Sequence, residues 1–161
     1  MELPKRKQNR LSCFDYSSNG AYAITICTKD KAKFLSEICR GGVLLRPQGK
    51  IIEKELLQLE KRYGIVVDKY CIMPNHVHLI IFIDKYNREE QSPSPTISDV
   101  VCAFKSITTK KINEFKNCKG RQIWQRSFFD HIIRNEQDLL FERRYIDENP
   151  VRWLTGDYRI R

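Results

Sequence analysis

The sequence predicts an α+β protein built on a ferredoxin-like antiparallel sheet with helices on one face. Apolar residues recur first with strand and then with helix periodicity, in the order strand, helix, strand, strand, helix, strand, helix. No internal repeat or break in composition divides the 161 residues, and this length is typical of one domain. We therefore expect a single domain over residues 1–161.

The first half of the chain predicts a strand, a helix and a hairpin. Gly64 follows a run of helical apolar spacing and marks a helix end, since glycine tolerates the left-handed conformation found there. Two strand-like runs are separated only by Pro74 and Asn75, which predicts an antiparallel pair with a tight turn. The expected elements are a strand at 22–28, a loop at 41–49, a helix at 52–63, and strands at 65–73 and 76–83.

The second half predicts two more helices around a strand. Asn135 can cap the last helix, and Pro150 is expected to end it because proline disfavours helical geometry at the residue before it. Outside these elements, residues 1–19 are interpreted as a basic N-terminal arm and residues 87–96 as a polar loop. The expected elements are a helix at 98–116, a strand at 123–133 and a helix at 135–149.

The charge balance points to a polyanionic partner. Lysine and arginine outnumber aspartate and glutamate by 29 to 20, which gives a net charge of +9. The six cysteines include no C-x-x-C pair, so zinc-finger spacing is absent and we expect reduced thiols. The N-terminal residues show no signal peptide, and no apolar stretch approaches the ~20 residues that span a bilayer. We expect a cytoplasmic protein with no membrane partner.

A pair of histidines on the second hairpin strand is the first candidate for chemistry. His76 and His78 project from the same face of a strand, because side chains alternate across it. The intervening face, carried by Val77 and Leu79, is apolar and is expected to pack on the core. Two imidazoles placed in this way can hold one metal ion, although satisfied polar histidines would show the same pattern.

The last predicted helix supplies a phenol and oxygen ligands. Tyr145 and Asn149 share a helix face at a spacing of four, and Glu148 lies beside them. A nucleophilic tyrosine needs a phosphate whose charge is neutralised, which a metal held by two histidines and a side-chain oxygen provides. The alternative is that Tyr145 simply packs on Phe141, one turn earlier.

Four ordered segments resemble the REP-associated tyrosine transposases, relatives of the small single-tyrosine insertion-sequence transposases. They are residues 70–82 (YCIMPNHVHLIIF), 104–113 (FKSITTKKIN), 124–134 (WQRSFFDHIIR) and 145–150 (YIDENP). Residues 10–17 and 20–28 are also similar to the start of these proteins, so the resemblance covers nearly the whole chain.

The resemblance implies an HUH nuclease fold that uses Mg²⁺ or Mn²⁺, with His76 and His78 as ligands and Tyr145 as the nucleophile on a catalytic helix over 135–149. Insertion-sequence relatives carry a glutamine four residues after the tyrosine, whereas this chain has Asn149. We expect Asn149 to complete the metal site, with Glu148 as the alternative.

The same resemblance implies a single-stranded DNA endonuclease and strand transferase that forms a 5′-phosphotyrosyl intermediate. Its partner would be the hairpin of a REP-like palindrome with a short tetranucleotide guide, and related active sites occur both within one subunit and across a homodimer. The basic arm and the polar loop either order DNA or are solvated tails. The candidate DNA-binding residues are Lys5, Arg6, Lys7, Arg10, Lys105, Arg143, Arg144 and Arg152.

Two other functions compete with this interpretation. One is a catalytically silent protein that binds palindromes or regulates on the same fold. The other is an unrelated metal enzyme with His-x-His in a barrel, although such sites draw further ligands and the chain has only three histidines. We assign the third, His131, a structural role with a hydrogen-bond partner near Asp130.

Overall fold

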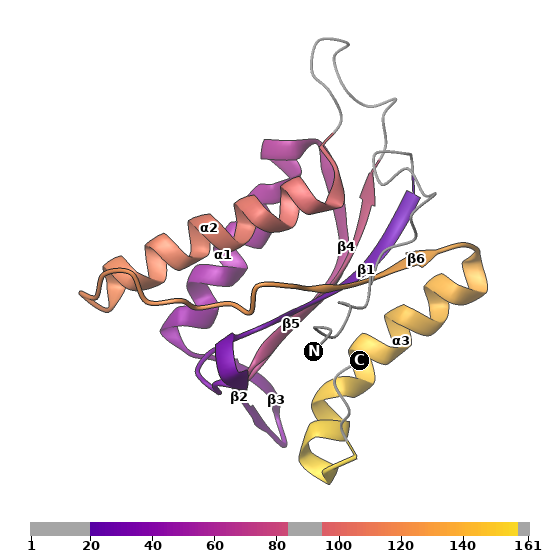
Figure 1. The fold of residues 1–161 in the computed structure, drawn as a ribbon. Coiled ribbons are helices and arrows are strands. Elements are labelled where there is room, and N and C mark those ends of the chain that lie inside the picture. Colours follow the sequence, from indigo (N-terminus) through magenta and orange to yellow (C-terminus); the bar gives the residue numbers. More distant parts are fainter. Residues whose placement is uncertain (1–19, 84–94, 158–161) are drawn as a thin grey trace, which may run out of the picture.

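The structure is a computed structural model that describes residues 20–83 and 95–157 (Figure 1). The predicted basic arm and most of the predicted polar loop lie outside the described residues. The elements are β1 (Gly20–Cys27), the 3-10 turn η1 (Lys29–Lys31), β2 (Ser36–Cys39), β3 (Gly42–Leu45), α1 (Pro47–Tyr63), β4 (Ile65–Met73), β5 (His76–Ile83), α2 (Ile97–Phe115), β6 (Phe129–Ile133) and α3 (Glu136–Thr155).

The central sheet is antiparallel throughout, with strand order β4-β5-β1-β6. This confirms the predicted ferredoxin-like arrangement, including the tight β4–β5 turn, where Met73 pairs with His76. Helices α1 and α2 lie together on one face of the sheet, while α3 crosses the other face (Figure 1). The sheet is therefore covered on both sides, and α3 stands apart from the two helices of the main core.

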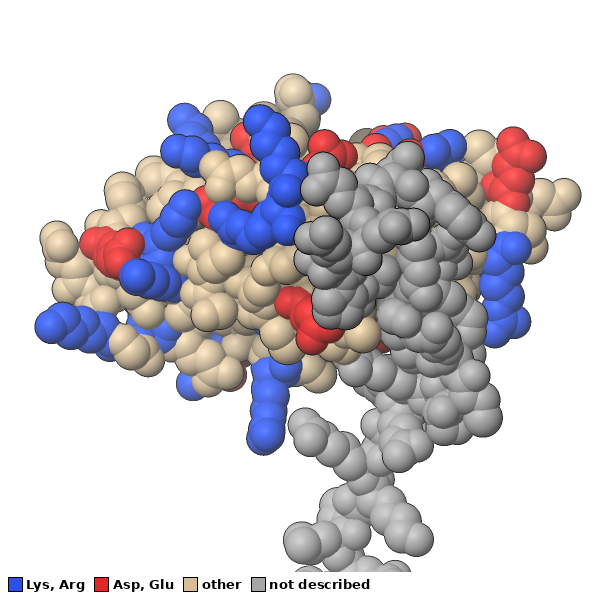
Figure 2. Space-filling view, turned by 90° about the horizontal axis from the view of Figure 1, so that it is seen from above, with Lys and Arg blue, Asp and Glu red and all other residues tan. Residues whose placement is uncertain are grey.

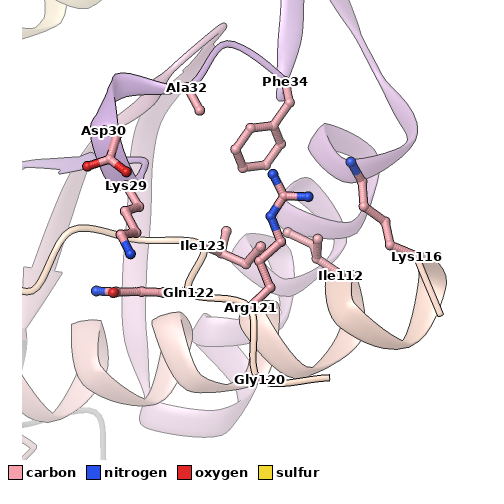
Figure 3. Close-up of a pocket in the computed structure, with 10 residues that line it drawn as sticks. All are labelled: Lys29, Asp30, Ala32, Phe34, Ile112, Lys116, Gly120, Arg121, Gln122 and Ile123. Carbon is pink, nitrogen blue, oxygen red and sulfur yellow. The ribbon is translucent and has the colours of Figure 1, made fainter. Parts of the chain in front are cut away.

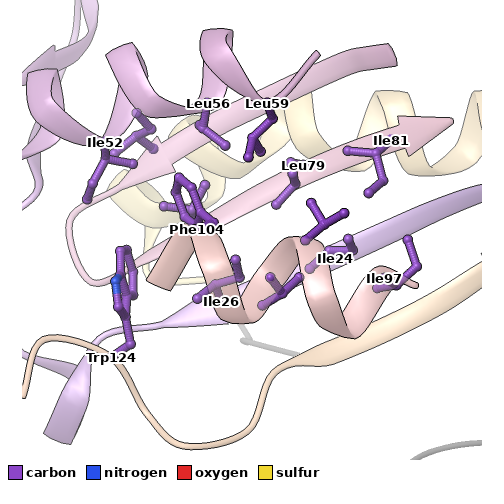
Figure 4. Close-up of a cluster of buried hydrophobic side chains, with 14 of the residues drawn as sticks. Ile24, Ile26, Ile52, Leu56, Leu59, Leu79, Ile81, Ile97, Phe104 and Trp124 are labelled. Atoms are coloured by element: carbon purple, nitrogen blue, oxygen red, sulfur yellow. The ribbon is translucent and has the colours of Figure 1, made fainter. Parts of the chain in front are cut away.

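The main core fills the space between the sheet and helices α1 and α2 (Figure 4). Alternation on β1 sends Tyr22, Ile24 and Ile26 into it, and all three are almost fully buried. Trp124 closes one end of the core, and its indole N–H donates to the hydroxyl of Thr108 at 2.9 Å.

The opposite face of the sheet is shallower and is shaped to receive α3. Ala21 and Ala23 of β1 point to that side, and their small side chains let the helix come close. Ile146 of α3 is buried against them. The second apolar cluster also contains Ile80 and Ile133.

Two segments differ from the sequence-based expectation. Residues 41–49 were predicted as a loop, but they contain strand β3 and the first turn of α1, which begins at Pro47. Each strand of the β2–β3 hairpin has only four residues, and their sequences, SEIC and GVLL, lack the apolar alternation that predicts a strand. The predicted strand at 123–133 was too long, because only its last five residues pair in the sheet.

The predicted end of the last helix at Asn149 was also wrong. Pro150 lies inside α3, which continues to Thr155 and ends at Gly156 with φ 77°. A proline inside a helix removes one backbone hydrogen bond. The extra turn carries Trp153, whose ring lies close to that of His76 of β5.

Among the described helices, none is long and apolar enough to cross a membrane.

Gly49 is the position where the backbone leaves no room for a side chain. A Cβ placed on it would lie 2.2 Å from the carbonyl oxygen of Leu35, which forces a shift of the backbone. We predict that Gly49→Ala lowers the free energy of unfolding by about 1–3 kcal/mol, as measured by urea denaturation. Gly41→Ala is the control, because its nearest neighbour would be 4.0 Å away. Equal stability of the two variants would contradict this close contact.

Candidate active site

The two histidines of β5 lie at the end of the strand next to the β4–β5 turn. In the sheet, His76 pairs with Cys27 and His78 with Thr25. Both point to the α3 side, away from the main core, as the parity of the strand predicts. They are nevertheless 0% and 3% exposed, because α3 covers this face.

The imidazoles are turned so that their Nε2 atoms meet. These two nitrogens lie 3.1 Å apart. Each Nδ1 is held from behind, that of His76 by Asn75 Oδ1 at 2.6 Å and that of His78 by Thr25 Oγ1 at 2.8 Å. Because an amide oxygen only accepts hydrogen bonds, Nδ1 of His76 carries the proton and Nε2 has a lone pair. When Thr25 Oγ1 accepts from His78 in the same way, the Nε2 lone pairs of both rings face one point.

This separation suits two ligands of one cation. Two nitrogens at about 2.1 Å from an ion, at a right angle, are about 3 Å apart. Burial lowers the pKa of His76 to about 2, with further contributions from His78 and Lys31. His76 is therefore neutral at physiological pH, the form that coordinates metal.

Asn149 supplies the strongest indication that something is bound between β5 and α3. Its side chain is fully buried, and neither Oδ1 nor Nδ2 has a hydrogen-bond partner among the described residues. A buried polar group without a partner costs ~1–3 kcal/mol, so such groups are rare unless a ligand satisfies them. An amide oxygen is an acceptable ligand for Mg²⁺ or Mn²⁺, so the residues present fit the implied metal.

Tyr145 lies one helical turn before Asn149 and faces the histidines. Its ring centroid is 5.4 Å from that of His78, in an edge-to-face arrangement. The guanidinium of Arg152 lies 6.0 Å from the centroid of the same ring. Phe141, the alternative packing partner, is 55% exposed. The described structure therefore brings the phenol to the histidine pair.

Glu148, the alternative third ligand, is engaged by cations. Its carboxylate accepts from Arg144 Nε at 2.6 Å and from Arg152 at 2.7 Å. These two hydrogen bonds lower the pKa of Glu148 below its ordinary value. Of the two candidates, Asn149 is buried with an unsatisfied amide, while Glu148 has its charge compensated.

Besides Asn75 and Thr25, which hold the two rings, sequence reasoning missed three residues around this site. Trp153 lies one turn beyond Asn149, and its ring centroid is 6.2 Å from that of His76. The ammonium of Lys33 sits 5.3 Å from the Trp153 ring centroid, and the charge of Lys31 reaches His76. The spacing of four between Asn149 and Trp153 was the available signal, but it was hidden by the expectation that Pro150 ends the helix.

The predicted DNA-binding cations that the structure describes all have protein partners. Arg143 pairs with Asp68 of β4, and Arg144 and Arg152 share Glu148. The ammonium of Lys105 is half-buried and donates to the carbonyl oxygens of Gln125 and Ser127, both at 2.9 Å. Lys5, Arg6, Lys7 and Arg10 lie outside the described residues.

Those three arginines are accessible despite their ion pairs. Exposed ion pairs are worth little, so a phosphate can compete for these guanidiniums. On the face shown in Figure 2, lysine and arginine side chains form several groups separated by acidic ones. On this face the positive charge is thus divided among several groups.

A second group of potential ligands lies farther along α3. His131 of β6 bonds to both carboxylate oxygens of Asp138, at 2.9 and 3.0 Å, so its partner is on α3. Ligand atoms of His131, Asp138 and the buried Glu142 lie within 4.8 Å of one another. A cavity of only about 10 Å³ lies between this group and the side chains of His78 and Tyr145. In this group His131 is already hydrogen-bonded to the carboxylate of Asp138. The amide of Asn149, by contrast, has no hydrogen-bond partner among the described residues.

A family model described as "Transposase IS200 like" matches residues 16–149 of the chain. An uncharacterized protein of Haemophilus influenzae is 34% identical over 163 residues, covering 92% of this chain and 89% of that protein. The REP-associated tyrosine transposase of Escherichia coli is 23% identical, covering 70% of this chain and 61% of that protein.

A similar fold occurs in a solved structure of a REP-associated tyrosine transposase bound to a REP hairpin. The TM-score is 0.59 at 19% identity, and the match covers 89% of this chain and 74% of that one. The fold that the sequence resemblance implied is thereby confirmed.

The unsatisfied amide of Asn149 predicts an unusual effect of mutation. Asn149→Leu should raise the free energy of unfolding of the metal-free protein by about 1–3 kcal/mol, because an apolar side chain of similar size removes the unpaired group. Urea denaturation in EDTA measures it.

Asn113→Leu is the matched control. Asn113 is also buried, but its amide donates to the carbonyl oxygen of Arg121 at 3.0 Å, so this change should destabilise the protein. If both variants lost stability alike, the amide of Asn149 would be satisfied within the protein.

Proposed function

Because this chain belongs to the IS200-like transposase family, we propose that it is a metal-dependent single-stranded DNA endonuclease and strand transferase with Tyr145 as its nucleophile. The observation that carries the proposal is that imidazole, amide and phenol side chains lie together at one place. A pair of buried imidazoles meets the phenol of Tyr145 between β5 and α3, and the unsatisfied buried amide of Asn149 lies one helical turn after that phenol. A purely DNA-binding protein has no need of this costly arrangement.

In this proposal His76, His78 and Asn149 hold one Mg²⁺ or Mn²⁺ ion. When bound, the ion neutralises the non-bridging oxygens of the phosphate that is attacked. The protein side chains orient the groups that would hold the ion. Asn75 and Thr25 fix the two rings from behind, which sets their tautomers and orientations.

The reaction is an exchange of one phosphate ester for another. The Tyr145 oxygen bonds to phosphorus, the bond from phosphorus to the 3′ oxygen breaks, and the leaving oxygen takes up a proton as a 3′-OH. The phenol loses its own proton, so the step is balanced without a cofactor that supplies energy. Attack of a second 3′-OH on the 5′-phosphotyrosyl group reverses the step and joins two strands.

The proposed substrate is single-stranded DNA folded into the hairpin of a REP-like palindrome. Support comes from the net charge of +9 and from the relative whose solved structure holds a REP hairpin. We propose that the basic arm, Lys105 and the three α3 arginines contribute to binding. Of these, Arg152 lies against the ring of Tyr145, with its guanidinium 6.0 Å from the ring centroid.

A covalent intermediate tests the proposal. With Mg²⁺ or Mn²⁺ and hairpin oligonucleotides copied from palindromes flanking the gene, the protein should form a denaturant-resistant adduct that peptide mapping places on Tyr145. Tyr145→Phe should bind the hairpin but lose adduct and nick by at least a hundredfold, because the nucleophilic oxygen is gone.

Tyr63→Phe is the control, since Tyr63 ends α1 on the opposite face of the sheet and should leave the adduct unchanged. Normal cleavage by Tyr145→Phe would exclude Tyr145 as the nucleophile. Hairpin binding with no cleavage by the unmodified protein would favour the silent palindrome-binding protein.

Binding should depend steeply on salt. Each phosphate neutralised by a side chain contributes a slope of about −0.7 to the plot of log affinity against log salt for a single strand. We predict that Arg144→Gln reduces the magnitude of this slope by about 0.7, because one guanidinium is lost. Fluorescence anisotropy with a labelled hairpin, measured from about 50 to about 300 mM NaCl, gives this slope. An affinity independent of salt would contradict binding through the backbone.

A further inference from the structure

A cavity of about 520 Å³ opens beside the C-terminal end of α2, outside the site described above. This volume falls within the range of about 300–1,000 Å³ that small-molecule sites occupy. Its lining comes from three separate segments: the turn that follows β1, the last turns of α2, and residues 120–123 (Figure 3).

The lining combines one aromatic ring with several cations. Lys29, Lys116 and Arg121 contribute positive charge, against one carboxylate from Asp30. The ring of Phe34 projects into the cavity, and the guanidinium of Arg121 lies close to it in Figure 3. The ammonium of Lys116 sits 5.7 Å from the Phe34 ring centroid. An aromatic face flanked by cations matches a nucleotide, which joins a flat base to an anionic phosphate.

The turn at residues 29–34 connects this cavity to the candidate active site. One side of the turn lines the cavity through Lys29, Ala32 and Phe34. The other side presents Lys33 to Trp153, the ring that packs near His76.

Backbone hydrogen bonds hold this turn to the β4–β5 turn. The Thr28 N–H donates to the Asn75 carbonyl oxygen, and the Phe34 N–H donates to that of Pro74, both at 2.9 Å. Asn75 immediately precedes His76. The cavity and the histidine pair are therefore separated by a single turn of chain.

We propose that this cavity binds an unpaired nucleotide of the same DNA strand whose phosphate lies at Tyr145. The base stacks on Phe34, while Lys116 and Arg121 contact its phosphates. Because a paired base has both faces covered by its neighbours, the cavity selects single-stranded DNA near the cleavage point. This inference rests on the proposed function, and it names a specificity subsite that lies outside the reacting atoms.

The test separates binding in the cavity from catalysis. In a Tyr145→Phe background and in EDTA, the affinity for 5′-fluorescein-labelled (dT)12 is measured by anisotropy. Arg121→Gln and Lys116→Ala should each weaken it about threefold to tenfold and reduce the salt slope by about 0.7. Phe34→Leu, which keeps an apolar side chain, should weaken it about tenfold through lost stacking.

Two exposed cations outside the cavity serve as controls. Arg40→Gln and Lys54→Ala remove the same kinds of charge from the β2–β3 turn and from α1, and they should leave the affinity within twofold. Photocrosslinking with 5-iododeoxyuridine in the oligonucleotide should map to Phe34 in the unmodified chain. Since Arg121 and Lys116 are exposed, their effects can be read even if Phe34→Leu folds poorly.

Competition identifies what the cavity recognises. Thymidine monophosphate should displace the oligonucleotide from the cavity, as followed by loss of the Phe34 crosslink, at concentrations where inorganic phosphate does not. Equal competition by inorganic phosphate, or affinities and crosslinks unchanged by the cavity variants, would overturn the subsite. Cleavage by the unmodified protein in that case would leave the proposed function standing.

Discussion

The burial of polar groups between β5 and α3 is the constraint on which the rest of the structure depends. Two imidazoles and one amide are almost fully removed from water, and the amide of Asn149 has no partner among the described residues. Such burial is unfavourable unless a ligand compensates it. In the proposed function, a cation shared by His76, His78 and Asn149 would offset this cost and would also hold α3 to the sheet.

Several features of the fold bring α3 against the sheet. The small side chains of Ala21 and Ala23 let α3 approach the sheet, and two ion pairs, Lys69 with Asp147 and Arg143 with Asp68, link it to β4. The main core lies on the other face and holds the sheet rigid without contributing to the site. Helix α3, which carries the proposed nucleophile Tyr145, thus packs on the opposite face of the sheet from the helices of the main core.

The sequence predicted much of this arrangement because strand and helix periodicity determine which side chains share a face. The parity of His76 and His78 and the spacing of Tyr145 and Asn149 predicted which side chains share a face, and the family resemblance assigned these residues their roles in the candidate site. Their burial was not predictable, since it arises from the docking of α3 against a strand distant in sequence. Trp153 was missed because tertiary packing overrides the local effect of Pro150.

The location of a bound cation tests the central claim most directly. A crystal of the protein grown with MnCl₂ and measured at the manganese absorption edge should show an anomalous peak within about 2.3 Å of Nε2 of His76, Nε2 of His78 and the amide oxygen of Asn149. A peak confined to the group formed by His131 and Asp138, with none between β5 and α3, would contradict the account.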